Sequence, residues 1–269
     1  MAIPILALIK ISSEVKQNFI RRRELFLVYQ PIINVATLKC EGIEALVRWK
    51  HPKYGVILPE KFLPYVIIAG KITNLGHWVM QQALTDYTKL TSLNFISVNI
   101  SADEFVASKT IETILDVLKK HKLKPSNLII EITETTIMHE TLASIEKFNS
   151  LADKGVRIAV DDFGAGYSTL NALKRLKLSI LKIDKSFISN IDKNSIDLIL
   201  VQSTIKLAHT LGFKVVAEGV ETKKQFKILQ LNNCDYVQGK LFSMPLNLYQ
   251  IKNFIANEQD LSDKFTRKK

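Results

Sequence analysis

The sequence predicts an α/β fold, a modified TIM (β/α)8 barrel, from two observations. Short runs rich in β-branched residues alternate with helical patterns along most of the chain. The 269 residues, 47% of them hydrophobic, can also bury the core of such a barrel, which typically needs about 250 residues. The predicted strands are Leu25–Ile33, Cys40–Arg48, Phe95–Ile100, Leu128–Thr133, Arg157–Asp161, Ile180–Asp184, Lys214–Ala217 and Tyr236–Gln238.

The first two predicted strands follow one another more closely than the others. Only about six residues separate Leu25–Ile33 from Cys40–Arg48, whereas a parallel crossover needs about a dozen or more. We therefore expect these two strands to pair antiparallel. The other six alternate with helices, so the first strand should run against the rest of the barrel.

Helical periodicity fills the intervals between the strands. The folded domain is expected over 21–257, with an N-terminal extension over 1–20 and a basic, disordered tail over 258–269. The apolar stretch Ala2–Ile9 is too short for a membrane span of about 20 residues. Two interpretations of the extension stay open: the remnant of a longer chain with an upstream sensory or membrane region, or a helix that packs on the barrel. The predicted helices are Thr73–Lys89, Ala102–His121, Thr141–Lys154, Thr169–Leu173, Ser195–Leu211, Thr222–Leu231 and Leu248–Ala256.

The composition limits the kinds of molecule that the protein can bind and the cellular compartment in which it is expected. The net charge of +11 is compatible with nucleic acid, a membrane surface or an anionic small molecule. The basic residues are scattered and lack the interleaved aromatic residues that bind single strands, so a nucleic-acid polymer is not expected to bind directly. Cys40 and Cys234 lie far apart and form no paired motif, which favours reduced thiols and a cytoplasmic protein, free or tethered to a membrane.

Acidic and amide residues recur where the apolar strands end. The carboxyl ends of parallel barrel strands meet at one rim, where the active site of such a barrel lies. Carboxylate and amide oxygens suit Mg²⁺ or Mn²⁺, and the adjacent pair Asp161–Asp162 suits two metals about 3.5–4 Å apart. Taken singly, most of these residues are more typical of a turn, a helix cap or a solvated surface than of a metal site. The residues are Glu44, Asn99, Glu131, Asp161, Asp162, Lys182, Asp184, Glu218, Glu221 and Gln238.

At these positions the sequence resembles the EAL-domain family of cyclic di-GMP phosphodiesterases, from about Leu25 to Ile255. A lone Glu-Ala-Leu would carry no information, but the ordered set of motifs is specific. The motifs are Tyr29-Gln30-Pro31-Ile32, Glu44-Ala45-Leu46-Val47-Arg48-Trp49, Ser97-Val98-Asn99-Ile100-Ser101, Glu131-Ile132-Thr133-Glu134, Asp161-Asp162-Phe163-Gly164-Ala165-Gly166-Tyr167-Ser168, Leu181-Lys182-Ile183-Asp184, Ala217-Glu218-Gly219-Val220-Glu221 and Gln238-Gly239.

The resemblance implies two divalent cations, Mg²⁺ or Mn²⁺, as cofactors. Glu44, Asn99, Glu131 and Asp161 would bind the first cation. Asp161 would bridge to the second, which Asp162 and Glu218 would also hold, Glu218 directly or through water.

The resemblance also implies catalytic roles. Lys182 would position the attacking water, and Glu218 is a candidate general base. Glu221 and Gln238 would support the waters around the metals. Glu134 would brace the loop Asp162–Thr169, which in the family couples to dimerisation, so a homodimer is expected.

The substrate implied is cyclic di-GMP, with Gln30 and Leu46 against the nucleotide and Arg48 on a phosphate. Hydrolysis would open the ring to linear 5′-pGpG and lower the messenger level in bacterial signalling, with biofilm formation and motility as the expected processes. The alternative is a catalytically weak or inactive cyclic di-GMP receptor. One departure bears on this choice: Ile67 and Ile68 replace an acidic pair that is usual in the family. They would either alter helix packing or weaken a substrate contact.

Overall fold

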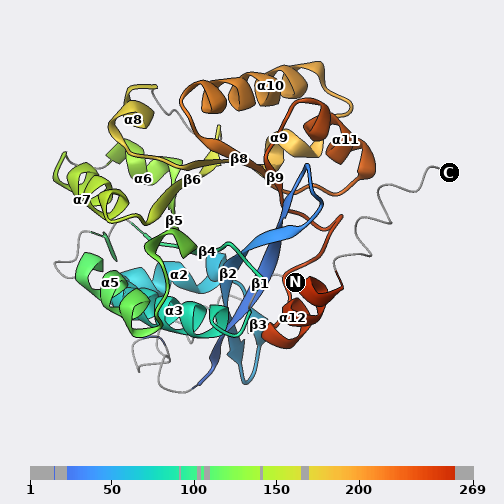
Figure 1. Ribbon diagram of the computed structural model, residues 1–269. Helices are drawn as coiled ribbons and strands as arrows, with labels where there is room; N and C mark the ends of the chain where they lie inside the picture. The colour runs from blue at the N-terminus through green and yellow to red at the C-terminus, as the bar shows by residue number, and fades with distance from the viewer. Residues whose placement is uncertain are drawn as a thin grey trace.

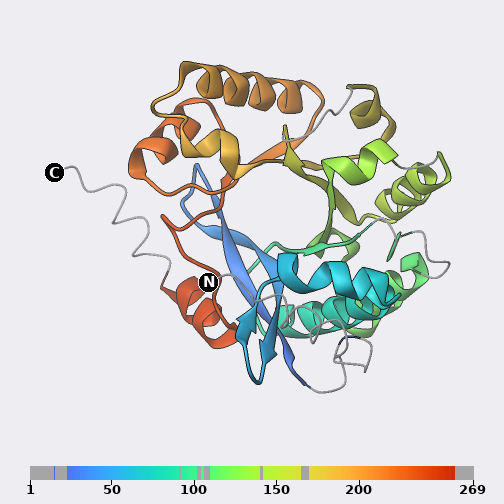
Figure 2. The same ribbon diagram turned by 180° about the vertical axis from the view of Figure 1, so that it is seen from behind.

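The computed structural model describes residues 15, 23–90, 92–101, 104–105, 110–139, 142–164 and 170–257. Apart from Val15, the predicted N-terminal extension lies outside these residues, as do the predicted tail and residues 165–169 of the predicted loop. Within the described chain, eight strands close a barrel that helices surround (Figure 1), as the reverse view also shows (Figure 2). The barrel strands are β1 (Leu25–Asn34), β2 (Cys40–His51), β4 (Phe95–Asn99), β5 (Leu128–Thr133), β6 (Arg157–Phe163), β7 (Ile180–Ile183), β8 (Lys214–Ala217) and β9 (Tyr236–Val237).

Strand β1 runs antiparallel to both of its neighbours. It pairs with β2 from Leu25↔Trp49 to Ile33↔Cys40, and with β9 at Ile33↔Val237. The pairs from β2–β4 through β8–β9 are all parallel. The predicted barrel with a reversed first strand is therefore confirmed.

Two elements beside the barrel were not predicted. Strand β3 (Gly55–Ile57) extends β2 as a hairpin, and helix α2 (Pro59–Ile68) follows it directly. The sequence obscures this helix because it contains two prolines. Pro59 lies in the first turn, where its missing N–H costs no hydrogen bond, but Pro64 lies inside the helix.

The helices that were predicted lie close to their predicted positions. The long predicted helix Ala102–His121 is described as helical at 104–105 and from Thr110 onward, and its other residues lie outside the description. Two short helices, α6 and α9, were not predicted. The helices are α3 (Ile72–Tyr87), α5 (Thr110–Lys120), α6 (Glu134–His139), α7 (Leu142–Asp153), α8 (Leu170–Arg175), α9 (Lys185–Ser189), α10 (Ser195–Thr210), α11 (Lys223–Leu231) and α12 (Leu248–Ala256), with a 3₁₀ turn at Pro125–Asn127.

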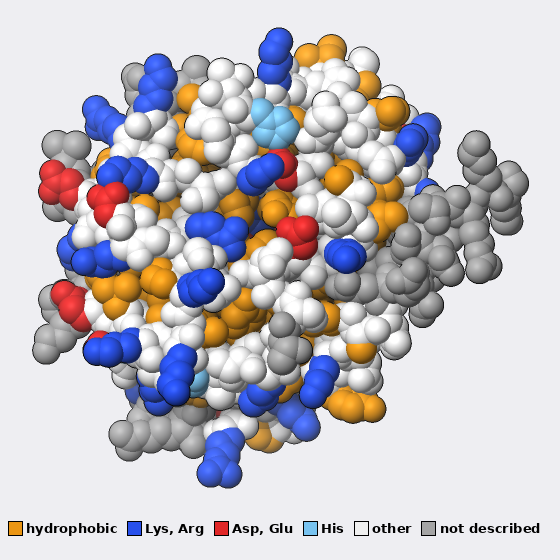
Figure 3. Space-filling model, viewed as in Figure 1, with side chains coloured by type: hydrophobic (Ala, Val, Ile, Leu, Met, Phe, Trp, Pro, Cys, Tyr) orange, Lys and Arg blue, Asp and Glu red, His pale blue; other side chains and the backbone are white. Residues whose placement is uncertain are grey.

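The face of the molecule drawn in Figure 3 carries no single basic patch. Lys and Arg side chains are instead spread over it. Across the described residues, none of the helices combines the length and hydrophobicity needed to cross a bilayer.

The barrel interior is layered along the strand direction. Side chains two residues apart on a strand share one face. On the inward face of several strands an apolar residue precedes the charged one, as Ile129 precedes Glu131 and Ile180 precedes Lys182. The apolar residues fill the amino-terminal half of the barrel and the charged residues lie above them, at the carboxyl ends. The apolar layer consists of Ile32, Phe95, Ile129, Ala159, Ile180 and Val216, with Tyr236 packed against it.

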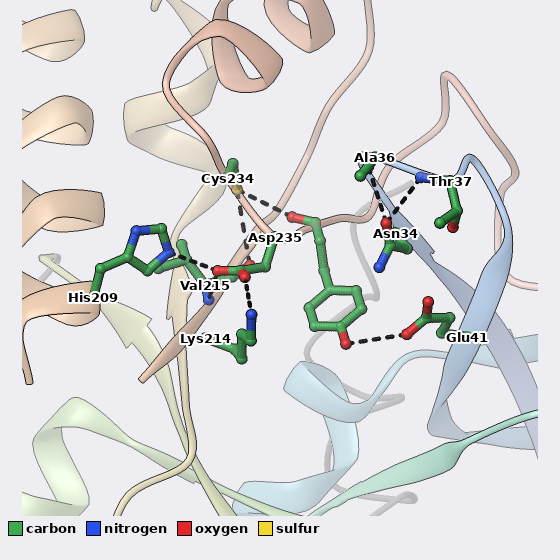
Figure 4. Close-up of polar contacts among 10 residues, drawn as sticks. Asn34, Ala36, Thr37, Glu41, His209, Lys214, Val215, Cys234 and Asp235 are labelled. Atoms are coloured by element: carbon green, nitrogen blue, oxygen red, sulfur yellow. Dashed lines mark hydrogen bonds and ion pairs between the residues drawn. The ribbon is translucent and has the colours of Figure 1, made fainter. Parts of the chain in front are cut away.

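A polar cluster ties α10 to the beginnings of β8 and β9 (Figure 4). The Asp235 carboxylate lies 2.7 Å from His209 Nε2 and 2.6 Å from Lys214 Nζ, and it accepts from the Val215 backbone N–H at 3.0 Å. Cys234 is buried beside it, which raises the pKa of its thiol to about 12. Both cysteines are free, in agreement with the expected reduced thiols.

We expect Asp235→Asn to lower the free energy of unfolding at pH 7 by about 1–2 kcal/mol, because two charge-assisted hydrogen bonds are lost. Burial opposes ionisation, but the bonds from Lys214, His209 and Val215 hold the pKa of Asp235 below its usual value. The carboxylate therefore stabilises the fold above the unfolded pKa of about 4, and this stability is lost as pH falls through the folded pKa. Urea denaturation at several pH values should show wild type and variant converging in acid. A constant difference would contradict this role, and Asp153→Asn, in an exposed ion pair, is the control.

Candidate metal centre

Lys182 lies at the centre of the charged layer. Its Nζ is 2.6 Å from Glu218, 2.9 Å from Glu131, 3.1 Å from Asp161 and 3.6 Å from Glu44. These residues come from β2, β5, β6, β7 and the end of β8, and Lys182 is only 1% exposed. The structure thus brings together residues that the sequence placed at five separate strand ends.

One ammonium group does not balance four carboxylates that are buried or partly buried. Burial alone would lower the Lys182 pKa, but the surrounding carboxylates raise it well above its usual value. Burial raises the pKa of Glu131 well above its usual value and that of Glu218 to about 8, against the opposing effect of Lys182. The pKa of Glu44 is lowered, because Lys182, Gln238 and Asn99 offset the effect of its burial. The centre therefore carries excess negative charge, which divalent cations would neutralise.

The donor set fits two hard cations. Oxygen atoms of Glu44, Glu131 and Asp161 lie within 4.8 Å of one another, and so do those of Asp161, Asp162 and Glu218. Asp161 belongs to both groups. All of these donors are carboxylate oxygens, as Mg²⁺ and Mn²⁺ prefer.

Asp161 and Asp162 can serve one centre because the backbone turns between them. Adjacent residues of a regular strand point to opposite faces. Here Asp162 has a left-handed φ of +55°, and the β6–β7 register shifts between Val160 and Phe163. Burial, together with the charge of Asp161, raises the pKa of Asp162. This irregularity of the backbone holds two carboxylates close together. Bound cations would offset the electrostatic repulsion between them.

Two amides orient Glu44. Asn99 Nδ2 donates to Glu44 Oε1 at 2.9 Å, and Gln238 Nε2 donates to Glu44 Oε2 at 2.8 Å and to Gln30 Oε1 at 3.0 Å. The other amide atom, Gln238 Oε1, is buried without a hydrogen-bond partner among the described residues. Such an orphaned acceptor suits a water molecule held at the centre.

Glu134 and Glu221, two of the predicted catalytic residues, lie apart from the lysine-centred cluster. Glu134 is buried and accepts a 2.8 Å bond from the backbone N–H of Gly164, where the predicted loop begins. Glu221 is about half exposed and pairs with Lys240 at 2.5 Å. Lys240 was not predicted, although its position two residues after Gln238, at a strand end, was an available signal.

A cavity of about 560 Å³ opens beside the centre. Leu46 and Arg48 line it, as do the metal-site residues Asn99 and Asp162, whereas Gln30 does not. Gln30 instead donates to the Ser243 carbonyl at 3.3 Å. Glu60 also lines the cavity and was missed together with helix α2, on which it lies.

The two isoleucines that replace the family's acidic pair lie away from this cavity. Ile67 is 46% exposed and Ile68 is 75% exposed, both on α2, and neither is among the residues that line the cavity. The departure therefore changes an outer surface of α2 rather than the wall of the cavity.

Comparisons with known proteins agree with this geometry. A family model described as "EAL domain" matches residues 13–245. The bifunctional diguanylate cyclase/cyclic di-GMP phosphodiesterase MucR of Pseudomonas aeruginosa is 39% identical over 241 residues, which are 88% of this chain and 35% of that protein. The cyclic di-GMP phosphodiesterase NbdA of the same organism is 36% identical over 251 residues, which are 92% of this chain and 32% of that protein.

A solved structure described as "PaMucR Phosphodiesterase, c-di-GMP complex" superposes with a TM-score of 0.84 at 38% identity. The match covers 89% of this chain and 99% of that one. The chain spans about a third of the length of the two curated relatives. Since the family model covers most of the sequence and the fold agrees, the chain belongs to the EAL domain family.

Proposed function

We propose that this chain is a metal-dependent phosphodiesterase that hydrolyses cyclic di-GMP to linear 5′-pGpG, and so lowers the messenger level in bacterial signalling. The observation that carries the proposal is the convergence of four carboxylates on Lys182 beside a cavity of nucleotide size. The relatives MucR and NbdA, described as cyclic di-GMP phosphodiesterases, supply the substrate class.

The residues divide into two cation sites. Glu44, Asn99, Glu131 and Asp161 would hold the first cation, and Asp161, Asp162 and Glu218 the second. Mg²⁺ or Mn²⁺ would activate water as a nucleophile and neutralise charge that develops at phosphorus.

The chain's own groups then position and move protons. Lys182 donates from a buried site to hold the attacking water and the charge on the phosphoryl oxygens. Glu218, whose pKa burial raises, accepts a proton from the water. The water oxygen bonds to phosphorus, the bond from phosphorus to the 3′ oxygen breaks, and that oxygen takes up a proton from solvent water.

Other residues orient the metal ligands and the substrate. Gln238 fixes Glu44 and Gln30, and Gln30 lies against the nucleotide from β1. Leu46 and Arg48 line the cavity, where Leu46 packs on the nucleotide and Arg48 binds a phosphate. The two outlying acids support the centre from a distance, Glu134 through the Gly164 backbone and Glu221 through water.

We also propose that the chain acts as a homodimer in the cytoplasm. Helix α10 exposes Ile196, Ile199 and Leu200, which share one stripe of the helix and suit a second copy of the chain. The free, buried thiols of Cys40 and Cys234 support a reducing compartment. Sedimentation equilibrium measures the oligomeric state.

Nucleotide analysis tests the proposed reaction. Purified protein incubated with cyclic di-GMP and Mg²⁺ or Mn²⁺ should yield 5′-pGpG, and an EDTA-treated sample should yield none. Binding without turnover in every metal would instead identify a receptor. Absence of binding would overturn both functions.

Metal addition should also stabilise the protein, because cations bind the native carboxylate cluster and not the unfolded chain. At a hundredfold excess over Kd the gain is about 2.7 kcal/mol, or roughly 5–10 °C in Tm for a chain of this size. Thermal denaturation with EDTA, Mg²⁺ and Mn²⁺ measures it. An unchanged Tm at millimolar metal would contradict a built metal centre.

A further inference from the structure

The cavity beside the metal centre has two chemically different ends. Asn99 and Asp162 line it at the end formed by the cation sites. Its other end is built from β2, α2 and α3, and the wall there is apolar. The apolar wall consists of Leu58, Leu63, Ile72, Leu75 and Val79.

Strand β2 sets the direction of the cavity. Glu44, Leu46 and Arg48 alternate along the strand and share a face, so each step advances about 7 Å from the metal centre. A substrate with its scissile phosphate at Glu44 therefore extends along Leu46 toward Arg48, which binds the second phosphate. The apolar wall is where a planar base would pack.

Glu60 places a carboxylate at this base end. Among the other carboxylates of the cavity, Asp162 belongs to the metal centre and Glu104 is occupied by Ser101, which donates to it from the backbone at 3.0 Å and from the hydroxyl at 2.8 Å. Glu60 is exposed in the first turn of α2, and among the described residues no hydrogen bond or ion pair engages it. The charge of Glu60 acts on Arg48, which lines the same cavity.

Guanine is the base that a carboxylate recognises at this position. The Watson–Crick edge of guanine presents two adjacent N–H donors, the ring N1–H and the 2-amino group, and a carboxylate can accept both. Adenine presents an unprotonated ring nitrogen at the same place, which a carboxylate repels. A site built to pair such donors rejects analogues that lack them.

We propose that Glu60 is a specificity-determining residue, which accepts hydrogen bonds from N1–H and the 2-amino group of one guanine of the substrate. The inference rests on the proposed function for the identity of the nucleotide. It adds a base contact to a site that is otherwise defined by its phosphate chemistry.

A thermodynamic cycle tests this contact. One change removes the carboxylate from the protein, and the other removes the 2-amino group from the ligand. The wild type and Glu60→Gln are each compared on cyclic di-GMP and on cyclic di-IMP, whose bases lack the 2-amino group. Titration calorimetry with Ca²⁺ in place of Mg²⁺ measures Kd, and turnover with Mg²⁺ measures kcat and KM. The preference of the wild type for cyclic di-GMP should fall about tenfold or more in Glu60→Gln, through Kd and KM rather than kcat. Any effect of the second guanine cancels in this ratio.

Glu112→Gln is the matched control, because Glu112 is also an exposed acid in the first turn of a helix and does not line the cavity. It should leave the preference unchanged. An equal preference in wild type and Glu60→Gln, or an equal loss with Glu112→Gln, would overturn the role of Glu60. A wild type that binds with a Glu60-dependent preference but does not cleave would overturn the enzymatic proposal alone. A wild type that binds neither nucleotide would overturn both.

Discussion

Asp161→Asn is expected to reduce turnover of cyclic di-GMP by at least about 10³-fold while leaving the fold intact. Loss of one preorganised electrostatic contact typically costs about 10²–10³ in rate, and Asp161 belongs to both candidate cation sites. The substitution also removes one anion from a cluster in which four carboxylates surround one ammonium group. The metal-free variant should therefore be at least as stable as the metal-free wild type.

This pairing of lost activity with retained stability makes the measurement decisive. Product analysis gives the rate, and thermal denaturation with and without Mg²⁺ gives the stability. The rise in Tm on adding Mg²⁺ should shrink in Asp161→Asn, while Asp153→Asn, in the exposed ion pair with Lys177, should match the wild type in both assays. Retained turnover in Asp161→Asn would contradict the proposal that this carboxylate bridges the two cations.

The barrel itself could be predicted from the sequence because its strands are buried on both sides. Strands β5 (Leu128–Thr133) and β8 (Lys214–Ala217) have the predicted bounds, and each is a short, nearly continuous apolar run. The short connection between β1 and β2 left only the antiparallel pairing. Chain length and local pattern were sufficient for these elements.

Helix α2 could not be predicted, because tertiary packing rather than local pattern stabilises it. Its buried residues are Phe62 and Val66, and the Phe62 ring packs edge-on against Trp49 of β2 with centroids 5.8 Å apart. Two prolines within ten residues hide the helical periodicity. Because this helix was not predicted, the end of the cavity that it forms, including Glu60, was not predicted either.

The candidate site was predicted as a set of residues at strand ends, but its geometry was not. Convergence of strand ends places Glu131 and Lys182 near one another in any parallel barrel. The left-handed backbone of Asp162 is a local irregularity that sequence periodicity does not encode. The Glu221–Lys240 pair depends on the side-chain conformations of two partly exposed residues, which also lie beyond a pattern argument.

Lys182→Met should have the second large effect, this time on stability as well as on turnover. Removing the ammonium group leaves four carboxylates around an apolar side chain, and an uncompensated buried charge costs about 3–5 kcal/mol. Methionine keeps most of the packing volume, so the loss reports charge rather than a cavity. Urea denaturation in EDTA at neutral pH measures the fall in unfolding free energy.

The pH dependence of this loss follows from the direction of the carboxylate pKa shifts. Burial raises the pKa of Glu218 to about 8 in the metal-free protein, far above the value of about 4.3 in an unfolded chain. The native state binds more protons than the unfolded state between these values, so stability is highest below the unfolded pKa and falls as pH rises through the folded pKa. Without Lys182 the carboxylate pKa values rise further. The loss of stability in Lys182→Met should therefore grow with rising pH and be smallest near pH 4.

Divalent cations distinguish this electrostatic account from a packing defect. Mg²⁺ supplies the positive charge that the variant lacks, so it should raise the Tm of Lys182→Met more than that of the wild type without restoring turnover, which still lacks the Lys182 ammonium group. Lys177→Met, which removes an exposed lysine paired with Asp153, is the matched control and should change neither quantity. If Lys182→Met were equally destabilised at pH 4 and pH 8, and gained no more from Mg²⁺ than the wild type, excess buried charge could not be the force that draws cations to this barrel.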